Sequence, residues 1–136
     1  MLVCGYDGTP GAHAGFDEAL RLAKDLGTGV VVVFAYERSR LATEMKDLDD
    51  VITERAQALL AEAADEAKAA GVEVTTKILE GNPAETLLAA ADECDARYIV
   101  VGSYGERPLK SALVGSTPSR LMHLSEHPVL VVRAED

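Results

Sequence analysis

The sequence predicts one α/β domain over residues 1–136, with an open five-stranded parallel sheet and helices on both faces. Two observations lead to this fold class. Short apolar runs alternate with stretches that carry helical spacing or helix caps, in the order βαβαβαβαβ. Residues 30–35 form an uninterrupted, mostly β-branched run, which is typical of a parallel strand covered on both faces. The expected strands are 2–6, 30–35, 72–79, 97–101 and 128–132, and the expected helices are 10–26, 48–70, 83–94 and 118–124.

Helix signals in the first half of the chain are local. Thr9 has the side chain of an N-cap, Pro10 suits the first helical position, and Gly27 ends this helix. Residues 48–70 then place apolar side chains at helical spacing, up to a terminating glycine. The polar connection 37–47, between the strand 30–35 and the helix 48–70, has no role that the sequence explains.

The second half of the chain continues the alternation. Residues 72–79 begin by alternating between apolar and polar side chains, which indicates a strand near a sheet edge. Asn-Pro-Ala-Glu at 82–85 has the pattern of a capping box. Ligands of such sheets bind beyond the carboxyl ends of the strands, where the strand order reverses. Strands one and four are expected to flank that point, which places residues 6–7 beside residues 102–103.

Composition bounds the class of protein. Hydrophobic residues make up 48% of the 136 residues and aromatic residues 4%, so the expected core is aliphatic. No stretch approaches the ~20 apolar residues of a membrane span. Residues 1–6 lack the length and the basic start of a signal peptide, and Cys4 and Cys94 make no disulfide framework. We therefore expect a cytoplasmic protein that does not associate with membranes.

The charge is strongly acidic and unevenly distributed. A formal net charge of −10 argues against nucleic acid as a partner, because phosphate backbones are bound by basic surfaces. Residues 97–136 depart from this pattern, since their five basic side chains outnumber four acidic ones. This segment is the part of the chain that does not repel an anion.

A glycine-rich loop follows the fourth expected strand. Gly102, Gly105, Gly115 and Ser116 have the spacing G-x2-G-x9-G-S, which is neither a Walker A motif nor a dinucleotide fingerprint. Glycine lets the backbone approach an anion closely. The start of the following helix offers unpaired N–H groups and the positive end of the helix dipole. The loop therefore predicts a phosphate site and a bound nucleotide.

This loop resembles the phosphate loop of the universal stress protein family, in the branch that binds ATP. The chain length, the element order, Asp7 after strand one and the Pro-Val-Leu-Val-Val ending at 128–132 are similar too. The resemblance implies a Rossmann-like sheet of strand order 3-2-1-4-5, and ATP with Mg²⁺ or Mn²⁺ carried by its phosphates. The residues implied for ATP are Gly5, Tyr6, Asp7, Ala35, Val101, Gly102, Gly105, Arg107, Gly115, Ser116 and Thr117.

The resemblance also implies what each part of this set does. The glycines line the triphosphate, and the N–H groups of Ser116 and Thr117 donate to it. Asp7 meets the adenosine beside the backbone of residues 5–6, and the main chain of Ala35 recognises the adenine edge. This sequence departs from the family's loop pattern at a few positions, and we expect these changes to weaken ATP binding without abolishing it. Pro118 removes one N–H donor, Pro108 stiffens the loop, Glu106 adds a carboxylate, and Arg107 and Lys110 compensate.

The last expected strand, Val129–Val132, predicts a homodimer. In the expected strand order it lies at a sheet edge, and a long apolar edge strand tends to aggregate unless it is paired. Pairing with the same strand of a second copy would satisfy both edges. The family resemblance points the same way. Other protein partners cannot be inferred from the sequence.

Our interpretation is an ATP-binding sensor or regulator of the stress response, without catalysis or with very slow turnover. The sequence shows no base placed for attacking water and no nucleophilic triad. His123 and His127 are four residues apart but lack a third ligand, so we expect no metal held by the protein itself. Two alternatives stay open: a slow ATP hydrolase or nucleotidyl transferase, and a dimeric scaffold without nucleotide. The stress and the pathway are not encoded in these patterns.

Overall fold

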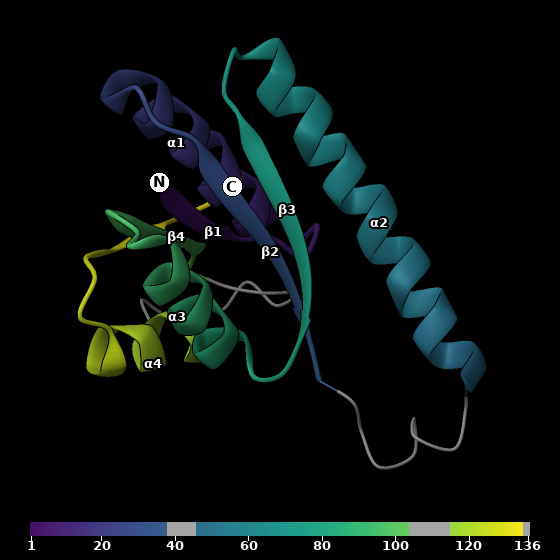
Figure 1. Cartoon of the computed structure of the whole chain (residues 1–136). Coiled ribbons are helices and arrows are strands. Elements are labelled where there is room, and N and C mark those ends of the chain that lie inside the picture. The colour runs from purple at the N-terminus through teal and green to yellow at the C-terminus, as the bar shows by residue number, and fades with distance from the viewer. Residues whose placement is uncertain (38–45, 104–114, 135–136) are drawn as a thin grey trace.

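The computed structural model describes residues 1–37, 46–103 and 115–134 (Figure 1). All strand pairs are parallel and the sheet order is β3-β2-β1-β4-β5, so the expected fold class and strand order are confirmed. The elements are β1 (Leu2–Gly5), α1 (Pro10–Leu26), β2 (Val30–Tyr36), α2 (Lys46–Ala69), β3 (Val74–Glu80), α3 (Pro83–Cys94), β4 (Tyr98–Gly102), α4 (Ser116–Leu124) and β5 (Val129–Val132).

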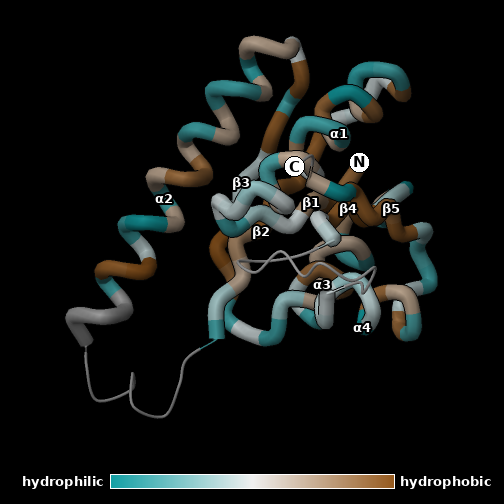
Figure 2. Tube along the Cα trace, turned by 180° about the vertical axis from the view of Figure 1, so that it is seen from behind, coloured by the Kyte–Doolittle hydropathy of each residue, from teal (hydrophilic) through white to brown (hydrophobic). Residues whose placement is uncertain are grey.

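Helices cover both faces of the sheet. Figure 1 shows α1 and α2 on one side and α3 and α4 on the other. Alternate residues of a strand face opposite layers: Cys4 and Val100 lie in the core under α1 and α2, whereas Val3 and Ile99 lie in the core under α3 and α4. Burying a large apolar side chain of this kind contributes about 1.5–3 kcal/mol. Figure 2 shows hydrophobic residues along β4 and β5, and an alternation of hydrophilic and hydrophobic turns along α2.

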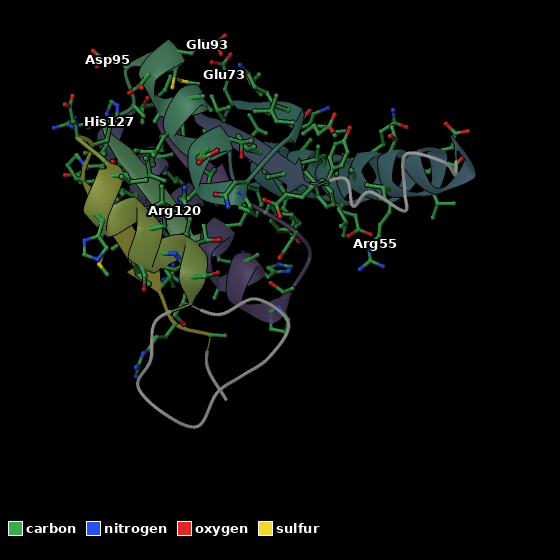
Figure 3. The ribbon with its side chains drawn as sticks, turned by 90° about the horizontal axis from the view of Figure 1, so that it is seen from below. Arg55, Glu73, Glu93, Asp95, Arg120 and His127 are labelled. Carbon is green, nitrogen blue, oxygen red and sulfur yellow. The ribbon has the colours of Figure 1, made fainter. Side chains whose placement is uncertain are left out.

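Two of the predicted helix caps are present. The Thr9 hydroxyl accepts a hydrogen bond from the Ala12 N–H at 3.2 Å, and Gly27 ends α1 in the left-handed conformation. The Asn82 side chain accepts from the N–H groups of Ala84 and Glu85, so this cap is also formed. The second half of the expected capping box is not formed among the described residues: the Glu85 carboxylate pairs with Arg120 on α4 at 2.8 Å. Figure 3 labels Arg120 on this helix.

Several element boundaries differ from the expectation by one or two residues. Helix α4 begins at Ser116 rather than near Pro118, because Gly115 is its N-cap and proline is tolerated in a first turn whose N–H groups have no partner within the helix. Helix α2 begins at Lys46, two residues before the expected start, and β1 ends at Gly5. None of the helices in the described ranges is long and apolar enough to cross a membrane.

A close contact between backbones joins α1 to the end of β4. A Cβ at Gly102 would overlap the carbonyl of Gly11, and a Cβ at Gly15 would lie 3.2 Å from the Gly102 nitrogen. Glycine at these positions lets the first turns of α1 lie directly on the carboxyl end of β4. The contact brings the β1–α1 turn beside the segment that follows β4.

Candidate functional site

A pocket of about 200 Å³ is lined by the carboxyl ends of β1, β2 and β4 and by the first turn of α4. The strand order reverses between β1 and β4, which is where parallel sheets bind ligands. Nine predicted residues meet in its lining: Gly5, Tyr6, Asp7, Ala35, Val101, Gly102, Gly115, Ser116 and Thr117. The segment with Gly105, Glu106, Arg107, Pro108 and Lys110 lies outside the described residues.

The first turn of α4 has no side-chain cap. Gly115 is the N-cap, and its own N–H donates to the Ser103 carbonyl at 2.7 Å. The N–H groups of Ser116 and Thr117 form no hydrogen bond within the described part of the chain, and Pro118 has no N–H. Two backbone donors at the positive end of a helix dipole therefore border the pocket.

Gly115 is required by space rather than by its backbone conformation. Its φ of −60° is open to any residue. A Cβ here would lie 2.8 Å from the Ser103 carbonyl oxygen, closer than real Cβ contacts come. A side chain at this position would therefore push the start of α4 away from the end of β4.

Ser103 holds this corner through its backbone and leaves its hydroxyl unpaired. Its N–H donates to the Val132 carbonyl at 2.9 Å, and its carbonyl accepts from Gly115. The residue is 2% exposed, and its Oγ has no hydrogen-bond partner among the described residues. An unpaired buried hydroxyl costs about 1–3 kcal/mol, so a polar partner at this position would be stabilising.

Asp7 is held in the β1–α1 turn by Thr9. Its Oδ1 accepts from the Thr9 N–H at 3.0 Å and from the Thr9 hydroxyl at 2.6 Å. The turn passes through Gly8, whose φ of +81° is in the left-handed region that favours glycine. One carboxylate oxygen of Asp7 thus anchors the turn, and Oδ2 has no hydrogen bond within the described residues.

The opposite wall of the pocket is apolar. Val33, Ala35, Leu87 and Val101 line it, and this surface suits a flat, weakly polar ring. The Tyr6 ring points elsewhere: it is part of the core under α1 and α2, where it packs edge-on against Phe16 with centroids 5.4 Å apart. The backbone of Tyr6, rather than its phenol, is therefore what a ligand in the pocket would meet.

Comparison with known proteins decides the family. The model of the universal stress protein family matches residues 1–133. The chain belongs to the universal stress protein family. The universal stress protein YxiE of Bacillus subtilis is 28% identical, over 98% of this chain and 97% of the relative.

Solved structures agree with this family assignment. The structure of protein MJ0577 of Methanocaldococcus jannaschii has a TM-score of 0.88 and 23% identity, and covers 99% of this chain and 96% of that one, which shows the shared fold. A universal stress protein crystallised in complex with cAMP has a TM-score of 0.78 and 28% identity, with 98% and 97% covered.

The histidine pair near the C-terminus of this universal stress protein has a structural explanation. His127 Nδ1 lies 2.8 Å from the Ala96 carbonyl, and Nε2 lies 2.9 Å from the Asp92 carboxylate. Both ring nitrogens are therefore engaged within the fold. His123 is exposed on α4.

Burial raises the pKa of the Cys4 thiol to about 12, so this cysteine is not a nucleophile.

The sequence does not predict every residue that lines the pocket of this universal stress protein. Thr9 was expected only as a helix cap, yet it also fixes Asp7, and the Asp-x-Thr spacing was the available signal. The other lining residues that were not expected are Ala12, Val33, Pro83, Leu87 and Pro118. They come from four different elements, and only tertiary packing brings them together.

Proposed function

We propose that this universal stress protein binds ATP in the pocket between β1, β2, β4 and α4, and acts as a nucleotide-dependent sensor or regulator in stress response. The observation that carries the proposal is the uncapped start of α4. The N–H groups of Ser116 and Thr117, which have no partner among the described residues, border the same pocket as an apolar wall. The 28% identical relative crystallised with cAMP supports a nucleotide ligand.

The residues present fit the parts of ATP. The phosphates would lie against Ser116 and Thr117, beside Gly115, whose missing side chain lets the start of α4 stay close to Ser103. The ribose would approach Asp7, whose Oδ2 is open to a hydroxyl group. Adenine would rest on the apolar wall beside the main chain of Ala35. Each contact uses a group that the fold already holds in place.

The proposed metal is Mg²⁺ or Mn²⁺ carried by the phosphates. These ions prefer several oxygen ligands. Among the described residues, Asp7 is the one carboxylate that lines the pocket, and its Oδ1 already anchors Thr9. The phosphate oxygens would therefore supply most of the coordination.

Slow turnover follows from the same geometry. Asp7 is the one described carboxylate in the lining that could act as a base toward an attacking water, and it is committed to the β1–α1 turn. We propose a role in binding rather than catalysis, with phosphate release slower than roughly 1 per second, the low end of ordinary enzyme rates.

Calorimetry with ATP and Mg²⁺ tests the proposal on the whole chain. We expect one nucleotide per chain. Nucleotide released by denaturing the freshly purified protein should be identified as ATP by mass spectrometry. Absence of binding by the wild-type protein at millimolar ATP would contradict the proposal. Phosphate release at ordinary enzyme rates would favour the hydrolase alternative.

We also propose a homodimer through the edge of β5. The Pro128 and Val132 carbonyls accept from Ile99 on β4 and from Ser103 directly after β4. Successive residues of a strand alternate in direction, so the backbone groups of Val131 face away from β4. A second copy of β5 could pair with these outward groups about a two-fold axis.

The substitution Val131→Pro tests the dimer, because it deletes an outward N–H and leaves the hydrogen bonds to β4 in place. Wild type should have the mass of two chains by light scattering at micromolar concentration, and the variant the mass of one. Val131→Thr, which keeps the shape and the N–H, is the control. A wild-type monomer would refute the proposal, and a dimeric proline variant would place the interface elsewhere.

A further inference from the structure

A cluster of metal-ligating groups lies outside the pocket, where α1 meets α2. His13 Nε2 is 3.3 Å from Glu66 Oε1 and 3.7 Å from Asp17 Oδ1. The three ligand atoms all lie within 4.8 Å of one another. His13 and Asp17 are one helical turn apart on α1, and Glu66 comes from α2, so two elements far apart in sequence supply the group.

The ligand types and spacings suit a transition metal ion. Two ligands bound at about 2.1 Å to one tetrahedral ion lie roughly 3.4 Å apart, close to the spacings around His13. One neutral imidazole and two carboxylates carry a charge that balances a divalent cation. Mixed nitrogen and oxygen ligands favour Zn²⁺ over Mg²⁺, which prefers an octahedral shell of oxygen atoms.

The surroundings of the cluster are acidic. The pKa of Tyr6 is raised by burial first, and then by the negative charges of Glu66, Glu62 and Asp17. Within the described residues, the ion-pair partner of Asp17 and of Glu66 is His13 in both cases, with no lysine or arginine. A cation at this position would therefore relieve repulsion between carboxylates.

We propose that His13, Asp17 and Glu66 form a Zn²⁺ site that joins α1 to α2. The three side chains are 45%, 55% and 40% exposed, so an ion can enter from solvent and keep a water molecule as its fourth ligand. Helix α2 otherwise packs mainly on β3 and β2, so the ion adds a link between the two helices. None of the three residues lines the nucleotide pocket. The site is therefore independent of the proposed ATP site.

Titration of the chelator-treated, nucleotide-free chain with Zn²⁺ tests the site. We expect one Zn²⁺ per chain by calorimetry and no comparable binding of Mg²⁺. His13→Gln, Asp17→Asn and Glu66→Gln should each weaken Zn²⁺ binding by about tenfold or more. All three side chains are partly exposed, so these variants should fold, and circular dichroism checks this.

Glu62→Gln is the matched control. Glu62 lies one turn before Glu66 on α2, and its replacement removes the same charge but none of the three ligand atoms. It should change the affinity for Zn²⁺ by less than about threefold, since exposed charges interact weakly. Equal losses in Glu62→Gln and Glu66→Gln would overturn the site in favour of general electrostatic attraction.

Thermal unfolding gives a second readout. Zn²⁺ at a hundredfold excess over its Kd should raise the Tm of wild type by roughly 5 °C or more, because it binds the folded chain. His13→Gln should lose this rise. No Zn²⁺ binding by wild type, or binding that all three ligand variants retain unchanged, would overturn the proposal.

Discussion

The starts of helices α1 and α4 lie against the same pocket, yet they are completed in opposite ways. Thr9 caps α1 with its side chain, and the same hydroxyl donates to Asp7. Helix α4 has Gly115 as its N-cap and no side-chain cap, and the N–H groups of Ser116 and Thr117 have no hydrogen-bond partner among the described residues. A capped helix start stabilises the fold, whereas an open one leaves donors for a ligand. The proposed phosphate contacts would therefore be made by the start of α4 and not by the start of α1.

The largest expected effect is at the open end. Gly115→Val should push α4 from Ser103 and weaken ATP binding at least tenfold, or about 1.4 kcal/mol. Calorimetry measures the affinity. Ser119→Val, which places the same side chain in the same helix outside the pocket lining, is the control. Undiminished ATP binding by a folded Gly115→Val protein would break the comparison.

The next effect is at the capped end. Thr9→Ala removes the acceptor for the Ala12 N–H and the donor to Asp7, so we expect a loss of about 1–2 kcal/mol in the free energy of unfolding. Urea unfolding measures it. Thr9→Ser keeps the hydroxyl and should retain most of that stability. Equal losses in both variants would mean that the methyl group, and not the cap, stabilises this end.

The smallest expected effect is the pH dependence of stability caused by His127, which contacts the end of α3. The Ala96 carbonyl and the Asp92 carboxylate are both acceptors, so both ring nitrogens of His127 can donate at once only when the imidazole is protonated. The hydrogen bond to Asp92 is the main cause that raises the pKa of His127; burial opposes it, and the Ala96 carbonyl adds to it.

A raised pKa fixes the sign of the pH effect. The contribution of protonated His127 to the stability of the fold is fully present below the pKa of histidine in the unfolded chain, which is about 6.5. It is lost as the pH rises through the higher pKa of His127 in the folded chain. Because Asp92 is exposed, we expect about 0.5 kcal/mol. Denaturant unfolding of wild type should lose this amount between about pH 6 and pH 8, and His127→Gln should show no such loss. A wild type that gains stability over this range would contradict the assignment.

Much of the fold could be predicted because its signals are local. The caps at Thr9 and Asn82, the glycine stop at Gly27 and the buried strand Val30–Tyr36 depend on neighbouring residues alone. The start of α4 was placed two residues late, because proline at the third position looked like a first helical residue. Local patterns locate an element well and its ends less well.

The lining of the pocket was predictable where a motif carried it. Gly102 and Gly115 follow from their spacing, and Asp7 from its place after the first strand. Val33 and Leu87 could not be found in this way, because their part in the lining depends on how β2 and α3 pack. The unpaired hydroxyl of Ser103 is also a tertiary property, since it requires the residue to be 2% exposed.

By itself, the sequence determined the order of elements and the parallel sheet, because hydrophobic periodicity and helix capping act over a few residues. Only the tertiary structure decided which groups meet across elements. Glu85 on α3 pairs with Arg120 on α4, and His13 on α1 pairs with Glu66 on α2. Such contacts depend on the spacing and angle of packed helices, which no short pattern in the chain encodes.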